Sequence, residues 1–244
     1  MNQSKTLIFI PTYNELENVE RIFREIKSFH LDADILFLDD NSPDGSGQVI
    51  DGLAEKNDHT FVIHRSGKQG IGSAHQSGIK WAYDRDYEKL ITMDCDFTHS
   101  PSYIINFIRH SDKAEIVVGS RYMKKHSLAS WNIFRKFLTN LGHFLTVNLL
   151  NMPYDASGAF RLYSLNKIDK NVFSLIRSNG YSFFFESLFI LHFNKKQIYE
   201  IPIELPSRTY GTSKMTFKDV WKSFVFLSKL FYRKSFNKKS LYTP

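Results

Sequence analysis

The 244-residue chain has little cysteine, no long apolar run and no apolar N-terminus. Its single cysteine, Cys95, excludes an intrachain disulfide, which is compatible with a reducing compartment. No stretch approaches the roughly 20 apolar residues that a membrane-spanning helix needs. The four apolar residues from Leu7 to Ile10 are too few for a signal-peptide core. We therefore expect a cytoplasmic protein whose contact with a membrane, if it has one, is peripheral.

Positive charge is concentrated at the C-terminus. The chain carries a net charge of +7, and residues 207–244 hold nine Lys and Arg residues against one acid, Asp219, a local charge of +8. The remainder therefore sums to −1. Three partners would suit this charge, namely a nucleic acid, an anionic membrane and a phosphorylated substrate.

Short apolar runs alternate with segments of helical periodicity in the first half of the chain. Strands are expected at 7–10, 35–38, 61–64, 90–93 and 115–119, with helices between them. This alternation predicts an α/β fold with a mostly parallel central sheet flanked by helices. Farther along, the sequence predicts helices at 128–152 and 183–193 and strands at 161–163 and 198–203.

The last predicted helix, from about 217 to 233, is amphipathic. On a helical wheel Val220, Phe224 and Leu227 share one face, and Lys222 and Lys229 lie on the opposite face. This pattern fits a helix in a membrane interface and fits equally a helix packed on the domain with a solvated basic side. We divide the chain into a catalytic domain, 1–216, and a basic tail, 217–244.

Two acidic clusters follow predicted strands. Asp94 and Asp96 flank Cys95 after the fourth strand, where both carboxylates can reach one Mg²⁺ or Mn²⁺ ion that also binds substrate phosphates. Asp39 and Asp40 follow the second strand, where a carboxylate can accept hydrogen bonds from a base or a ribose, or can simply close a turn. The carboxyl ends of parallel strands are the usual ligand edge of such sheets.

Several basic residues are candidates for anion binding. Lys68 and Arg65 lie near glycines that match neither a dinucleotide fingerprint nor a P-loop and are better explained by a tight turn before a helix. Arg121 follows the fifth strand, and Arg135 lies within an apolar helix, where an unpaired charge is costly. A lipid phosphate would suit both arginines, and so would a structural salt bridge.

Seven segments, in order and together covering about residues 7–216, resemble glycosyltransferase family 2, and within it the dolichyl- or polyprenyl-phosphate mannosyltransferases. They are Pro11-Thr12-Tyr13-Asn14-Glu15, Asp39-Asp40-Asn41-Ser42-Pro43-Asp44-Gly45, Gly67-Lys68-Gln69-Gly70-Ile71-Gly72-Ser73-Ala74, Met93-Asp94-Cys95-Asp96, Val118-Gly119-Ser120-Arg121-Tyr122, Asp155-Ala156-Ser157-Gly158-Ala159-Phe160-Arg161 and Arg208-Thr209-Tyr210-Gly211-Thr212-Ser213-Lys214.

The resemblance implies a GT-A fold and an inverting transfer of a sugar, with GDP-mannose favoured as donor, to a polyprenyl phosphate on the cytoplasmic face of a membrane. It implies metal binding by Asp94 and Asp96, with Thr98 as a third ligand, and acceptor-phosphate binding by Arg121 and Arg135. The donor-binding residues it implies are Pro11, Tyr13, Glu15, one of Asp39 and Asp40, Arg208 and Lys214, with Lys68 nearby.

The chain departs from the family pattern at several positions. Cys95 stands where many relatives have Ala, Thr98 replaces a Gln or Ser, and Ala159 interrupts a Ser-Gly-Phe-Arg pattern. Two alternatives stay open: a transferase of the same fold with a UDP-sugar donor or a glycan acceptor, and a binding module without enzymatic activity whose tail grasps lipid or nucleic acid. We expect no nucleic-acid partner, because a binding module without enzymatic activity would give the acidic and glycine clusters no role.

Overall fold

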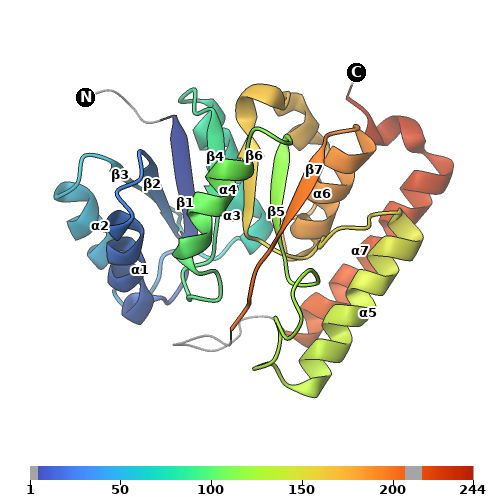
Figure 1. Ribbon diagram of the computed structural model, residues 1–244, viewed down its shortest axis with the longest axis horizontal. Helices are drawn as coiled ribbons and strands as arrows, with labels where there is room; N and C mark the ends of the chain where they lie inside the picture. The colour runs from blue at the N-terminus through green and yellow to red at the C-terminus, as the bar shows by residue number, and fades with distance from the viewer. Residues whose placement is uncertain (1–4, 207–215, 244) are drawn as a thin grey trace.

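A seven-stranded sheet forms the centre of the computed structural model, which describes residues 5–206 and 216–243 (Figure 1). The strand order is β3-β2-β1-β4-β6-β5-β7. The strands are β1 (Thr6–Thr12), β2 (Asp34–Asp39), β3 (Thr60–His64), β4 (Lys89–Thr92), β5 (Ile116–Ser120), β6 (Arg161–Ser164) and β7 (Ile198–Pro202).

All neighbouring strands are parallel except at β6, which runs antiparallel to β4 and to β5. All six residues of β2 are buried, as expected for a strand with helices on both sides of its sheet. The prediction of a mostly parallel α/β sheet is therefore confirmed.

Helices cover both faces of the sheet. On one face, α1, α2 and α4 bury apolar side chains such as Ile22, Ile50 and Phe107 against Ile8 and Ile10. A second buried cluster on the other face includes side chains of α3, α5, α6 and α7. The helices are α1 (Leu16–Ser28), α2 (Ser46–Glu55), α3 (Ile71–Tyr83), α4 (Ile104–His110), α5 (Ile133–Leu150), α6 (Ser182–Phe193) and α7 (Phe217–Phe236), with short 3₁₀ turns at Pro101–Tyr103, Leu165–Lys167, Lys170–Leu175 and Lys238–Leu241.

The helix predicted from residue 128 begins five residues later. Asn132 caps α5, because its side-chain oxygen accepts a hydrogen bond from the backbone N–H of Arg135 at 2.8 Å. Residues 121–131 form bends and turns instead. Arg135 therefore lies in the first turn of α5, where its backbone is fixed by the cap.

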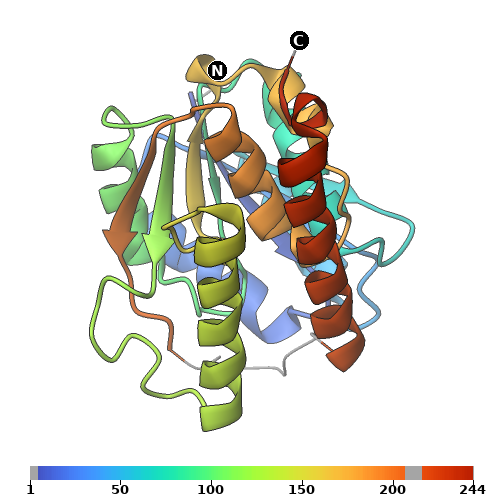
Figure 2. The same cartoon turned by 90° about the vertical axis from the view of Figure 1, so that its right-hand side faces the viewer.

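Helix α7 packs against α5 and α6 along one side of the molecule (Figure 2). Its N-terminus is closed by a capping box between Thr216 and Asp219. Leu227 and Leu230 are buried in the core, so the helix is packed on the domain, one of the two arrangements that its amphipathic pattern allowed. In the described part of the chain, no helix combines the length and apolar content that crossing a bilayer takes.

Close contact between α3 and β1 depends on a glycine. A Cβ atom at Gly78, in the interior of α3, would lie 2.6 Å from carbon atoms of the Phe9 ring, which is fully buried. At Gly52, in the interior of α2, a Cβ atom would meet nothing within 4 Å. The two helical glycines therefore form a matched pair, one crowded and one open.

We expect Gly78→Ala to lower the free energy of unfolding by about 1–3 kcal/mol, because the ring of Phe9 must shift in a packed core. Gly52→Ala should raise it by about 0.5–1 kcal/mol, since alanine is the better helix former. Urea denaturation of both variants and the wild type measures the difference. A Gly78→Ala variant as stable as Gly52→Ala would contradict the packing described here.

Candidate active site

One cavity of about 750 Å³ lies at the carboxyl ends of β1, β2, β4 and β5. Its lining combines loops that follow these strands with side chains from α5, α6 and α7. The lining includes Pro11, Tyr13, Glu15, Asp40, Lys68, Asp94, Asp96, Thr98, His99, Arg121, Trp131, Arg135, Leu138, Leu145, Phe184, Phe185, Asp219, Phe224 and Leu227. The site residues predicted from the β1, β2, β4 and β5 ends therefore meet in one place, with one exception.

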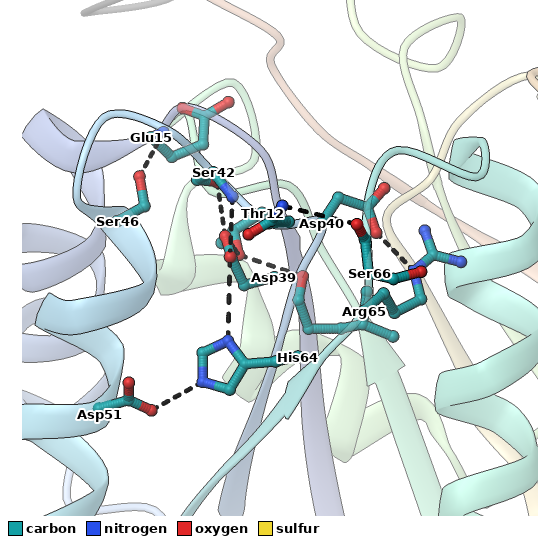
Figure 3. A network of polar contacts seen from close by, with 12 residues as sticks. Thr12, Glu15, Asp39, Asp40, Ser42, Ser46, Asp51, His64, Arg65 and Ser66 are labelled. Atoms are coloured by element: carbon teal, nitrogen blue, oxygen red, sulfur yellow. Dashed lines mark hydrogen bonds and ion pairs between the residues drawn. The ribbon is translucent and has the colours of Figure 1, made fainter.

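That exception is Asp39, which does not line the cavity. Its carboxylate is 2% exposed and accepts hydrogen bonds from the backbone N–H of Ser42 at 3.0 Å and from its hydroxyl at 2.5 Å (Figure 3). The neighbouring Asp40 does line the cavity. Of the two adjacent acids, Asp39 thus closes the turn and Asp40 faces the space where a ligand would bind.

A buried ion pair fixes Asp40. The Nε of Arg65 donates to the Asp40 carboxylate, and both side chains are 8% exposed. The same guanidinium donates to the hydroxyl of Ser73 at 2.7 Å, in the first turn of α3. Arg65 therefore connects the end of β2 to the start of α3, and its role in the structure is to hold Asp40 rather than to line the cavity.

The glycine-rich loop brings Lys68 to the cavity wall. Gly70 has a φ of +99°, and a Cβ atom there would lie 2.4 Å from the backbone oxygen of Asn179, so only glycine fits. The Nζ of Lys68 lies 4.9 Å from the ring centroid of Tyr13, a cation–π contact. As predicted, the glycines precede a helix, because α3 begins directly after Gly70, and this loop also positions a cation beside the loop that follows β1.

Asp94 and Asp96 lie on the wall formed by the turn after β4. Asp96 is 3% exposed, and its Oδ1 accepts hydrogen bonds from the backbone N–H of Thr98 at 3.1 Å and from its hydroxyl at 2.6 Å. Asp94 is more accessible, and its backbone N–H donates to Nδ1 of His99 at 2.9 Å. The turn that follows them therefore holds the carboxylate of Asp96 and the backbone of Asp94, and both side chains line the same cavity.

Two carboxylates in one cavity fit a Mg²⁺ or Mn²⁺ ion. Residues 5–206 and 216–243 contain no group of three His, Cys, Asp or Glu side chains arranged to hold a metal. A pair is sufficient for these ions, because they commonly take one or two carboxylates and complete their shell with water and substrate phosphates. The hydroxyl of Thr98 orients Asp96, and its use as a further ligand stays a prediction.

Two arginines also line the cavity. The Nε of Arg121 donates to the fully buried carboxylate of Asp155 at 2.7 Å, and the backbone N–H of Arg121 donates to the same oxygen at 3.0 Å. The guanidinium carbon of Arg135 lies 3.4 Å from the ring centroid of Trp131. Arg121 thus forms a structural salt bridge, which was one of the two predicted roles for its charge. It also lines the cavity.

Part of the cavity lining is apolar. Leu138 and Leu145 of α5, Phe184 and Phe185 of α6, and Leu227 of α7 form it. His143 lies beside them, and burial lowers the pKa of its imidazole, although the nearby Asp155 acts in the opposite direction. His143 therefore adds no positive charge to the apolar part of the lining at neutral pH.

Three side chains that support the site had no individual signal in the sequence. Arg161 is fully buried and donates to the backbone oxygens of Ala156 and Phe184 at 2.9 and 2.7 Å, which fixes the segment before β6 against α6. Asp155 and His99 hold Arg121 and Asp94 as described above. Asp155 and Arg161 belong to one of the family-like segments, so the resemblance marked the segment without indicating what each residue does.

Two predicted donor-binding residues, Arg208 and Lys214, lie outside the described residues.

Two known proteins match most of this chain and most of their own length. It is 33% identical to the polyprenol monophosphomannose synthase of Mycolicibacterium smegmatis, over 87% of this chain and 81% of that protein. It is 30% identical to the undecaprenyl-phosphate mannosyltransferase of Micrococcus luteus, over 87% of this chain and 88% of that protein.

Two solved structures are similar at lower sequence identity. The mannosyltransferase PcManGT from Pyrobaculum calidifontis, in complex with GDP-Man and Mn²⁺, aligns with a TM-score of 0.52 and 13% identity, over 93% of this chain and 70% of that one. S. aureus TarS 1–349 in complex with UDP aligns with a TM-score of 0.56 and 12% identity, over 95% of this chain and 65% of that one. These likenesses confirm the GT-A fold.

A family model covers most of the chain. Residues 7–181 match the model for glycosyl transferase family 2, and that range includes the loops after β1, β2, β4 and β5 that build the cavity. The chain therefore belongs to glycosyl transferase family 2.

Proposed function

We propose that the protein transfers a mannosyl group from GDP-mannose to a polyprenyl monophosphate, with inversion at the anomeric carbon. The observation that carries this proposal is the set of chemistries gathered in the lining of one cavity: two carboxylates, two arginines, and apolar side chains from three helices. A nucleotide-sugar with its metal, a phosphate and a polyprenyl chain need these environments together. The names of the two relatives describe the same acceptor class and the same sugar.

The donor would bind at the end of the cavity formed by the β1 and β2 loops. Pro11, Tyr13, Glu15 and Asp40 line it, and Lys68 lies beside Tyr13. Asp40 is oriented by Arg65 and is suited to accept hydrogen bonds from the nucleoside. Arg208 and Lys214 are proposed to bind the diphosphate.

Asp94 and Asp96 would hold Mg²⁺ or Mn²⁺ against the diphosphate. When bound, the ion supplies positive charge that stabilises the leaving GDP. The chain contributes the fixed orientation of the two acids, through Thr98 at Asp96 and through His99 at the backbone of Asp94. Because these partners are already in place, little reorganisation is needed at the reacting end of the donor.

The acceptor phosphate would lie between Arg121 and Arg135, with its polyprenyl chain along the apolar wall. A phosphate oxygen is ionised at neutral pH and can attack the anomeric carbon without transferring a proton to the protein. The arginines orient this nucleophile, since a guanidinium group binds phosphate through two parallel hydrogen bonds. The carbon–oxygen bond to GDP breaks as the new bond forms on the opposite face, which gives inversion.

We propose that the protein works on the cytoplasmic face of a membrane, docked through α5 and α7. These helices expose Ile133, Phe134, Phe137, Leu141, Phe144, Phe217, Trp221, Phe224, Phe231, Tyr232 and Phe236. Leu141 and Phe224 also line the cavity, so the exposed apolar surface is continuous with the apolar wall. Lys218, Lys222 and Lys229 of α7 are exposed and would attract anionic lipid headgroups. Residues 217–244 thus act as a surface anchor as well as a part of the fold.

Transfer of radiolabelled sugar to a short polyprenyl phosphate tests the reaction. GDP-mannose should give a labelled lipid, whereas UDP-glucose and UDP-N-acetylglucosamine should not. With Mn²⁺ present, GDP at about 100 times its Kd should stabilise the fold by about 2.7 kcal/mol, and UDP should not. Labelled lipid from a UDP-sugar alone would identify a different donor, and no labelled lipid from any donor would contradict the proposed reaction.

Asp96→Asn should lower turnover by at least about a hundredfold, because an amide is a poorer metal ligand than a carboxylate. The same variant should lose the dependence of GDP binding on Mn²⁺, measured by calorimetry with and without a chelator. Asp58→Asn is the control, since Asp58 is exposed and does not line the cavity. Full activity of Asp96→Asn would refute the metal assignment.

Vesicle flotation tests the docking surface. Phe217→Ser with Trp221→Ser should reduce binding to anionic vesicles about tenfold or more, because each side chain loses an apolar contact worth over 1 kcal/mol. Ile105→Ser on α4 removes a side chain of 38% exposure from a helix on the other face of the sheet and should leave binding unchanged. Equal flotation of the double variant and the wild type would contradict docking through α7.

A further inference from the structure

Trp131 lies near both arginines of the proposed phosphate site. It immediately precedes the cap of α5, is 8% exposed and lines the cavity. Its indole Nε1 is buried and has no hydrogen-bond partner among residues 5–206 and 216–243. The ring is therefore held by packing, and the face that meets the guanidinium groups is the part of the side chain that interacts with charge.

Both arginines lie within cation–π range of this one ring. The guanidinium carbon of Arg135 is 3.4 Å from the ring centroid, and that of Arg121 is 5.9 Å away. Arg135 comes from the first turn of α5 and Arg121 from the end of β5, so no common element of secondary structure sets their separation. The ring is a packed surface near both charges, and its negative face partly offsets their repulsion.

Asp155 fixes Arg121 through an ion pair. It pairs with Nε, which leaves Nη1 and Nη2 without a hydrogen bond to the described residues. A Cβ atom added at Gly158 would lie 3.3 Å from Nη2 of Arg121, so the backbone of Gly158 approaches the guanidinium group closely. Arg121 is thus oriented by an ion pair, and Arg135 stacks on Trp131.

We infer that Trp131 is a positioning residue that sets the orientation of Arg135, and its distance from Arg121, for binding one phosphate group between them. This inference rests on the proposed function and deepens it at the acceptor end. Trp131 therefore controls the KM for the polyprenyl phosphate and not the binding of the nucleotide-sugar. The stacked arrangement requires the planar guanidinium group, which lysine cannot replace.

Trp131→Leu should raise the KM for a short polyprenyl phosphate about tenfold, and Trp131→Phe less than about threefold, because phenylalanine keeps a ring face. The KM for GDP-mannose should change less than twofold in both variants. Trp81→Leu is the matched control: Arg85 stacks on Trp81 at 4.0 Å with the same four-residue spacing, away from the cavity lining, and its loss should leave the acceptor KM unchanged.

A double-mutant cycle separates this role from a general effect on the fold. Arg135→Lys should also raise the acceptor KM about tenfold, and the Trp131→Leu, Arg135→Lys double variant should show no more than the larger single effect. Multiplicative effects, or an equal rise in the KM for GDP-mannose, would overturn the inference. So would a Trp131→Phe variant as impaired as Trp131→Leu.

The fluorescence of Trp131 itself tests the inference without replacing that residue. The sequence has three tryptophans, so Trp81→Phe with Trp221→Phe leaves Trp131 as the sole emitter. Its emission should change on titration with the short polyprenyl phosphate and saturate near the acceptor KM, and Arg135→Lys should shift that saturation to higher concentration. No change in emission would overturn the inference. A wild-type protein that transfers no mannose would instead count against the proposed function itself.

Discussion

A buried charged side chain on the wall of a cavity has to be held by a buried partner, and the geometry of this site depends on that constraint. Asp40 is paired with Arg65, and Arg121 is paired with Asp155, in both cases between side chains that are 8% exposed or less. Removing one member of such a pair leaves a buried charge uncompensated, which costs more than the pair contributes. The buried charges of Asp40 and Arg121 can therefore face a ligand because Arg65 and Asp155 already compensate them.

The sequence was informative about the sheet because local pattern determines it. Short apolar runs such as Leu7–Ile10 are found in β1, and the acids that follow the runs are found at one edge of the sheet. Neighbouring residues were harder to separate. Asp39 and Asp40 carry the same group, yet one closes a turn on Ser42 and the other faces the cavity. That difference depends on backbone direction at the end of β2, which composition and spacing do not encode.

Contacts between distant segments were beyond sequence reasoning for a different reason. The partner of Arg121 lies 34 residues away, and the apolar wall joins side chains from α5, α6 and α7. The amphipathic pattern of α7 was visible, but a wheel does not distinguish Leu227, which is buried, from Phe224, which is 48% exposed and lies near it on the wheel. Neighbouring helices decide which part of an apolar stripe is covered, and their positions follow only from the folded chain.

The reversed direction of β6 has a consequence for how such a site can vary. Arg161, at the start of β6, pairs with Thr92, at the end of β4, so the chain enters β6 at the same edge where it leaves β4. A parallel strand in this position would begin at the opposite edge and carry the segment with Asp155 and Gly158 away from Arg121. Because of the reversal, the whole connection from β5 through α5 to β6 stays on the ligand side. Insertions or deletions in that connection can therefore reshape the acceptor end without altering strand register or the donor end.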